Sequence, residues 1–197
     1  MSSAAAPAGR ATTAMVGLWV FMAVVSTLFF LFTIAFLMRM AVSDWRALPL
    51  VPWQLWLSSA LLAGAGIAWS AAGRATTHAA LSRGWFAGCV LSLLFLAAQL
   101  WAWQAMLAMN FPVDGNPANS FFYLITGLHG VHVLGGLVGA GVLGLRLARG
   151  AELARLRSAA TLCARYWHFL LVLWLAMFAL LFLVTPDFVQ LCSNLLR

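Results

Sequence analysis

The sequence predicts an all-α integral membrane protein, built as one bundle of five transmembrane helices, and two observations predict it. Hydrophobic residues make up 64% of the 197 residues and charged residues only 8%, more apolar surface than a soluble fold of this length buries. The charged residues also divide the chain into five uncharged runs, each longer than the roughly 20 residues that a helix needs to cross the membrane. Helices are expected because an open strand leaves its backbone polar groups without partners in lipid.

Each uncharged run predicts one helix of a single transmembrane domain that covers residues 14–186. The runs are 11–38, 47–73, 84–113, 115–145 and 166–186. The helices are expected to cover residues 14–40, 50–72, 82–110, 119–147 and 160–186. Residues 1–13 are expected to form an N-terminal tail and residues 187–197 a short external tail. The first run is too long for the apolar part of a signal peptide, so it is interpreted as an uncleaved span.

The arginines predict the orientation of the bundle. All 11 basic residues are arginines, and they lie in the short gaps between the apolar runs, where charge sets topology. With the N-terminus inside, the cytoplasmic side holds most of them: Arg10, Arg74, Arg83, Arg146, Arg149, Arg155, Arg157 and Arg165. The positive-inside rule therefore predicts a cytoplasmic N-terminus and an external C-terminus. The same placement argues against a nucleic-acid partner, despite the net charge of +7.

Rows of small residues predict close helix packing. The rows are Gly84 with Gly88, Gly135 with Gly139, and Gly136 with Ala140 and Gly144. Such rows let helix backbones approach closely, and in lipid the resulting van der Waals contact takes the place of the hydrophobic effect. The alternative is that glycine is simply common in membrane helices.

Three of the four histidines fall inside expected helices, where a polar side chain is costly and usually has a partner. His129 and His132 share a helix face, a spacing that can place two imidazoles near one metal, but no third ligand is evident. They and His168 are interpreted as hydrogen-bonded packing residues that link helices to one another or to a partner, with metal or heme ligation as the alternative. The three cysteines show no CxxC or CxxCH pattern, which argues against a zinc site and an attached heme.

No carboxylate falls inside an expected helix, so a self-contained proton path is not predicted. The acidic residues, which lie in loops or at helix ends, are Asp44, Asp114, Glu152 and Asp187. No serine, cysteine or threonine has the neighbouring base and orienting group that nucleophilic catalysis needs. Physical chemistry alone therefore predicts a helical body that packs, binds lipid and binds a partner.

Several stretches resemble the helix signatures of subunit III of the heme-copper oxidases, from Gly17 to Leu183. The most specific are the HGxHV element from His129 to Val133 and the YWHF element from Tyr166 to Phe169. Weaker matches are Gly17 to Ala23 with Phe29 and Phe30, Phe95 to Gln99, Trp103, and Trp174. Five spans match a short branch of this family that lacks two N-terminal helices.

The resemblance implies a non-catalytic accessory subunit of a bacterial respiratory oxidase, located in the cytoplasmic membrane with its C-terminus in the periplasm. Such a subunit holds no heme or metal; hemes and copper belong to partner subunits, and the expected partners are catalytic subunit I, subunit II and membrane lipids. The motif residues expected to act structurally are Gln99, His129, His132, Tyr166, Trp167, His168 and Trp174. Bound phospholipid is expected in a cleft between the first two helices and the last three, with Arg74, Arg83 and Trp85 as candidate contacts.

The sequence also departs from the family pattern. Three positions where relatives usually carry a carboxylate hold Val25, Ala102 and Leu171, which puts any proton-related role in doubt. Three alternatives remain open at this point. They are a NorE-like subunit that accompanies a nitric oxide reductase, an independent heme-binding membrane protein using His129 or His132, and an unrelated scaffold or transporter component.

Overall fold

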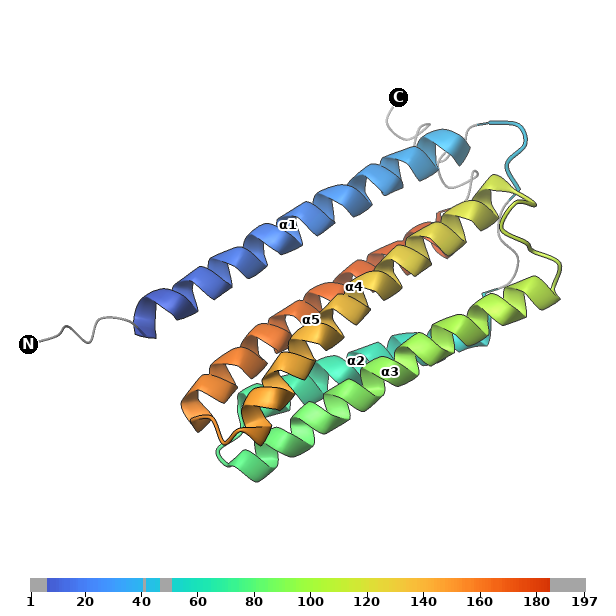
Figure 1. Cartoon of the computed structure of the whole chain (residues 1–197). Coiled ribbons are helices and arrows are strands. Elements are labelled where there is room, and N and C mark those ends of the chain that lie inside the picture. Colours follow the sequence, from blue (N-terminus) through green and yellow to red (C-terminus); the bar gives the residue numbers. More distant parts are fainter. Residues whose placement is uncertain (1–6, 41, 47–50, 185–197) are drawn as a thin grey trace, which may run out of the picture.

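The computed structural model describes residues 7–40, 42–46 and 51–184, with side chains from residue 13 onward. This part of the chain forms five α-helices (Figure 1): α1 (Pro7–Met40), α2 (Trp53–Gly73), α3 (His78–Ala108), α4 (Pro117–Ala148) and α5 (Leu153–Leu183). All five are long and apolar enough to cross a membrane, which confirms the predicted all-α, multi-pass class.

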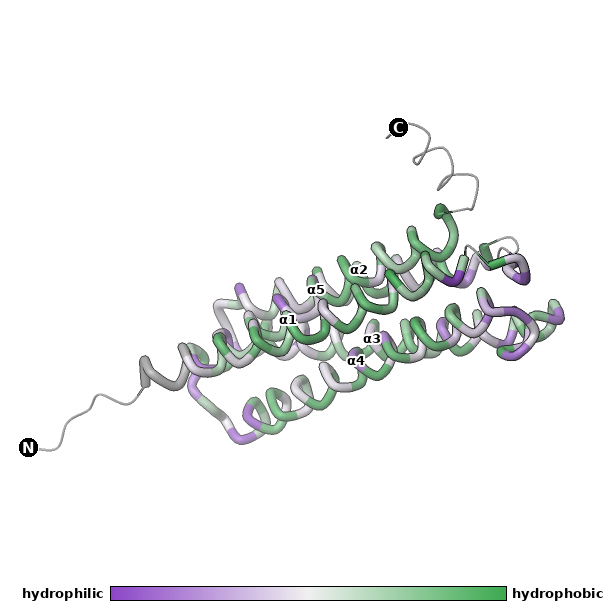
Figure 2. The backbone as a smooth tube through the Cα atoms, turned by 90° about the horizontal axis from the view of Figure 1, so that it is seen from above, coloured by the Kyte–Doolittle hydropathy of each residue, from purple (hydrophilic) through white to green (hydrophobic). Residues whose placement is uncertain are grey.

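The outer surface of the bundle is apolar, as contact with lipid requires. Met38, Ile67 and Val138 on three different helices are 72%, 70% and 71% exposed. Hydrophobic residues run along the middle of the helices, and hydrophilic residues gather mainly at the helix ends and in the loops (Figure 2). This distribution is expected of a bundle whose middle contacts the hydrocarbon of a membrane and whose two ends contact water.

The helix ends follow local capping chemistry and differ from the predicted boundaries. α3 begins at His78, before the expected residue 82, because the Thr77 hydroxyl accepts a hydrogen bond from the Ala80 amide at 3.1 Å. α1 and α5 begin at Pro7 and Leu153, also earlier than expected, so Arg10 falls inside α1 and Arg155 and Arg157 fall inside α5. The predicted end of the fifth helix and the tail 187–197 lie outside the described residues.

The helices group differently from the division that the sequence suggested. α2 packs most closely against α3 and also lies against α5, while α4 packs against α5 and α3. The main contacts of α1 are with α4 and α5, and Figure 1 shows α1 along one side of the bundle. The expected separation of the first two helices from the last three is therefore wrong, because α2 belongs to the body formed by α3, α4 and α5.

Close approach of helices is confirmed for two of the three small-residue rows. A Cβ atom at Gly88 would lie 2.7 Å from the Trp69 indole, and one at Gly136 would lie 2.9 Å from the Trp167 ring. Gly144 likewise lies directly against the Trp85 ring. The row of Gly135 and Gly139 is different: among the described residues nothing lies within 4 Å of a Cβ added at either position, so this row makes no close helix contact there.

Gly136 and its neighbour Gly135 provide a matched test of this packing. Gly136→Ala should destabilise the protein by about 1–3 kcal/mol, because the new methyl group meets aromatic rings that are themselves buried. Gly135→Ala adds the same methyl group in open space and should be neutral or slightly stabilising through helix propensity. Unfolding of both variants in mixed micelles would be compared, and equal losses of stability would contradict the packing described.

Candidate functional site

A set of indole–hydroxyl hydrogen bonds links the helices across the core. Trp167 Nε1 on α5 donates to Ser92 Oγ on α3 at 2.7 Å, and Trp174 Nε1 donates to Ser59 Oγ on α2 at 2.8 Å. Each serine hydroxyl also donates a hydrogen bond to a backbone carbonyl one turn earlier in its own helix. Each indole N–H therefore finds an acceptor in a hydroxyl whose hydrogen is already in use, and α5 is connected to both α3 and α2.

The same arrangement recurs between α3 and α4. Trp103 Nε1 donates to Thr126 Oγ1 at 3.0 Å, and that hydroxyl donates to the Phe122 carbonyl at 2.6 Å. Trp85 Nε1 donates directly to the Ala140 carbonyl at 2.8 Å. Interhelical hydrogen bonds of this kind contribute roughly 0.6–1.7 kcal/mol each in membrane proteins.

Two further motif residues complete these links. Gln99 Nε2 on α3 donates to Ser58 Oγ on α2 at 3.1 Å, and the Tyr166 hydroxyl on α5 donates to the His132 carbonyl on α4 at 2.9 Å. Four predicted motif residues (Gln99, Tyr166, Trp167 and Trp174) thus bond to a neighbouring helix. The sequence indicated that interior hydroxyls, Ser92 among them, bond either their own preceding turn or a neighbouring helix, but it did not single out Ser58 or Ser59.

His129 lies at the centre of the four-helix body, with no exposed surface. Its ring packs between Phe95 on α3 and Trp174 on α5, with ring centroids 5.7 Å and 5.4 Å away. Neither ring nitrogen has a hydrogen-bond partner among the described residues. An unpaired buried polar group costs about 1–3 kcal/mol, and His129 carries two of the unpaired buried side-chain atoms found among the described residues.

His132 points to the other side of α4, towards α1. Its Nδ1 donates to the Leu128 carbonyl at 2.7 Å, and its ring lies 5.6 Å from the Phe29 ring and 6.2 Å from the Phe21 ring. The two histidines of the HGxHV element therefore face different neighbours, and their rings do not converge on one point. This geometry does not favour a shared metal at His129 and His132.

His168 is exposed on α5, and its ring lies against Gly66 of α2. Its Nδ1 donates to the Ala164 carbonyl at 2.7 Å, which is again a bond within its own helix. Among the described residues there is no group of three or more histidine, cysteine or acidic side chains that could hold a metal ion.

The three positions where a carboxylate is missing are filled by packing residues. Val25 and Ala102 are buried at 2% and 0% exposure, and Leu171 is half-buried against the core. A charge at Val25 or Ala102 would have to be desolvated, and the side chains that surround these positions belong to the hydrophobic core.

The candidate lipid contacts lie at one end of the bundle but differ in availability. Arg74, the C-cap of α2, and Arg83, in the second turn of α3, are both exposed. Trp85 is half-buried, and its N–H is already bonded to the Ala140 carbonyl of α4. The two arginines are therefore accessible to a phosphate, whereas Trp85 packs α3 against α4.

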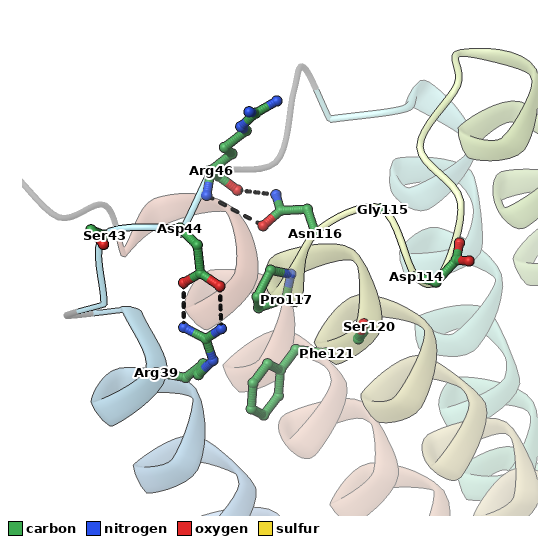
Figure 3. A pocket seen from close by; sticks show the side chains of 10 residues that line it. All are labelled: Arg39, Ser43, Asp44, Arg46, Asp114, Gly115, Asn116, Pro117, Ser120 and Phe121. Atoms are coloured by element: carbon green, nitrogen blue, oxygen red, sulfur yellow. Dashed lines mark hydrogen bonds and ion pairs between the residues drawn. The ribbon is translucent and has the colours of Figure 1, made fainter.

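At the opposite end, a polar hollow of about 720 Å³ lies between the α1–α2 connection and the start of α4 (Figure 3). The Asn116 side chain accepts a hydrogen bond from the Arg46 amide at 3.3 Å and donates one to the Arg46 carbonyl. Arg39 and Asp44 form a bidentate pair at 2.6 Å, and hydrogen bonding to the guanidinium holds the pKa of the Asp44 carboxyl below its usual range. These contacts fix the end of α1 to α4.

Comparison with known proteins identifies the family. The sequence profile of cytochrome c oxidase subunit III matches residues 9–185, which is nearly the whole chain. The chain belongs to the cytochrome c oxidase subunit III family.

The curated proteins that this chain resembles include distant bacterial relatives. The chain is 29% identical over 104 residues to a probable cytochrome c oxidase subunit 3 from Nocardia farcinica, a match that covers 53% of this chain and 51% of that protein. A cytochrome c oxidase subunit 3 from Corynebacterium diphtheriae is 28% identical over 103 residues, covering 52% of this chain and 50% of that protein. The chain thus spans about half the length of the curated relatives it matches.

The Trp167–Ser92 bond can be measured with a double-variant cycle. Trp167→Phe and Ser92→Ala each remove one partner, and Ser92→Ala also leaves the indole N–H buried without an acceptor. The coupling between the two substitutions should be roughly 0.6–1.7 kcal/mol in unfolding free energy. Trp167→Phe combined with Ser158→Ala, an exposed serine bonded only within α5, is the control pair and should be additive. Additivity in both pairs would show that the bond contributes nothing.

Proposed function

We propose that this chain is the non-catalytic accessory subunit III of a bacterial respiratory heme-copper terminal oxidase. The supporting observation is that its core polar side chains serve to link helices, in a chain that belongs to the subunit III family. Its role is to pack against catalytic subunit I, with subunit II as a further partner, and to stabilise that assembly. Oxygen reduction and proton translocation belong to the partner subunits.

The histidines support a structural role over heme ligation. A heme ligand needs an imidazole nitrogen free to face the porphyrin, whereas His129 is enclosed between two aromatic rings and His132 faces the phenylalanines of α1. The missing carboxylates support the same assignment, because proton relays in membranes use acidic or histidine chains. A NorE-like association is the alternative within the family, and the identity of the catalytic partner separates the two.

The proposed orientation places the arginine-rich end of the bundle in the cytoplasm. Arg74, Arg83, Arg155 and Arg157 lie at that end, and the Arg39–Asp44 pair lies at the other. The positive-inside rule then gives a cytoplasmic N-terminus. The exposed arginines at that end suit the anionic headgroups of the inner leaflet, and we include phospholipid binding in the proposed function.

Purification with native partners tests the proposed function. A mild-detergent preparation of the tagged chain should contain a larger subunit with heme and copper, whereas the chain expressed alone should show no Soret band and no stoichiometric metal. His132→Leu should lower the yield of the complex modestly while leaving turnover per assembled complex unchanged, because the ring packs against α1. A Soret band in the isolated chain, or normal yield without turnover in this variant, would contradict the accessory role.

Lipid retention tests the two arginines. Native mass spectrometry of an Arg74→Ala/Arg83→Ala double variant should show less bound phospholipid than the wild type, since guanidinium groups pair bidentately with phosphate. Arg46→Ala is the matched control, because that side chain is exposed at the opposite end of the bundle. If the double variant and the wild type retain the same lipid, these arginines only set topology.

A further inference from the structure

Side chains from four helices meet at one level in the middle of the body formed by α2, α3, α4 and α5. His129 of α4 packs against Phe95 of α3 and Trp174 of α5. Trp174 donates to Ser59 of α2, and Ser59 is adjacent to Ser58, which accepts from Gln99 of α3. We name this set of five polar or indole side chains the central layer: Ser58, Ser59, Gln99, His129 and Trp174.

Gln99 and His129 lie at the same depth on facing helices. Gln99 follows Phe95 by one helical turn on the same face of α3, and Phe95 is the ring that contacts His129. Contacts above and below this level agree. Towards the C-terminal end of α3, Trp103 bonds Thr126 of α4. Towards the N-terminal end of α3, Leu96 lies 3.7 Å from a Cβ atom added at Gly130 of α4. The Gln99 level on α3 therefore corresponds to residues 128 and 129 on α4.

The central layer contains polar atoms that the protein does not pair. Gln99 uses its amide N–H but leaves Oε1 buried without a donor, and His129 leaves both ring nitrogens without a partner. Gln99 and His129 are 5% and 0% exposed, so neither bulk water nor lipid headgroups reach them. A neutral imidazole carries one N–H donor and the amide oxygen is an acceptor, so the unpaired atoms of the two side chains are complementary.

We infer that the central layer binds an internal water molecule between His129 and Gln99. The water accepts a hydrogen bond from the imidazole N–H and donates one to Gln99 Oε1, which satisfies a donor and an acceptor with one ligand. Buried waters in proteins occupy sites of this kind, where otherwise unpaired polar groups converge. The inferred function of the site is to fix the relative height of α3 and α4, because sliding either helix by one turn would separate the two groups. The inference does not depend on which oxidase the chain serves.

A density map of the native complex, at a resolution that shows ordered water, tests the site directly. The expected result is one water peak within hydrogen-bond distance of a His129 ring nitrogen and of Gln99 Oε1. A map with no density between the two side chains, or with the ring nitrogen bonded directly to the amide oxygen, would overturn the inference.

Substitutions provide an independent readout in the full-length chain in nanodiscs. Gln99→Met and His129→Phe are similar in shape to the side chains they replace, and each removes one partner of the water. The double variant should lose little more thermal stability than either single variant, because the first substitution already forfeits the water. Gln99→Met with His132→Phe is the control pair and should be additive, since His132 faces α1 rather than the central layer. Additive losses for Gln99 and His129 would also overturn the inference.

Discussion

The structure depends on one constraint, which is that a hydrogen-bond donor placed in hydrocarbon must find its acceptor inside the protein. Four tryptophans meet it by donating to another helix, three of them to a hydroxyl and one to a backbone carbonyl. The hydroxyls accept these bonds without losing their own, since each still donates to its preceding turn. Trp69 is an exception: its buried N–H has no partner in the part of the chain that the structure describes, and its ring centroid lies 4.8 Å from that of Trp167.

The first helix is held by different interactions. The buried residues of α1 form a single stripe along its length: Met22, Val25, Phe29, Phe36 and Met40. Phe29 packs on His132 at one level, and Phe36 packs on Trp45 and Phe121 near the C-terminal end of α1. The Asn116 side chain accepts a hydrogen bond from the Arg46 amide and donates one to the Arg46 carbonyl, which connects the α1–α2 loop to α4. The Arg165 guanidinium of α5 also donates to Met15 Sδ of α1 at 3.1 Å. α1 is thus attached by ring packing, by its loop and by this contact, whereas α2 to α5 are linked by hydrogen bonds inside the core.

The sequence predicted the number of helices and much of the site, but not how the helices group. Composition and charge spacing suffice for five spans, because the bilayer demands length and low charge. The motif residues Trp167 and Trp174 were identified by resemblance, and both lie fully inside the core. Ser58 and Ser59 carried no signal of their own, since a serine that receives an interhelical bond looks the same in sequence as one that bonds only its own turn.

Helix grouping was missed for a related reason. Small residues mark a surface that another helix can approach, but they do not say which helix approaches it. Gly88 receives Trp69 of α2, and Gly136 receives Trp167 of α5, whereas Gly135 next to it faces open space. Distinguishing these positions requires knowing the rotation of each helix. That rotation is set by where the large aromatic partners lie on the neighbouring helices.

The most direct test of this account measures which helices separate first as the fold is weakened. Pulsed electron spin resonance would follow two label pairs on exposed positions, Phe30 with Val138 for α1 and α4, and Leu94 with Val172 for α3 and α5. The account predicts that added denaturing detergent broadens the α1–α4 distance before it changes the α3–α5 distance. The reason is that, of these two pairs, the described residues show a hydrogen bond between helix interiors for α3 and α5 alone. Loss of the α3–α5 distance first, or of both at the same detergent concentration, would contradict it.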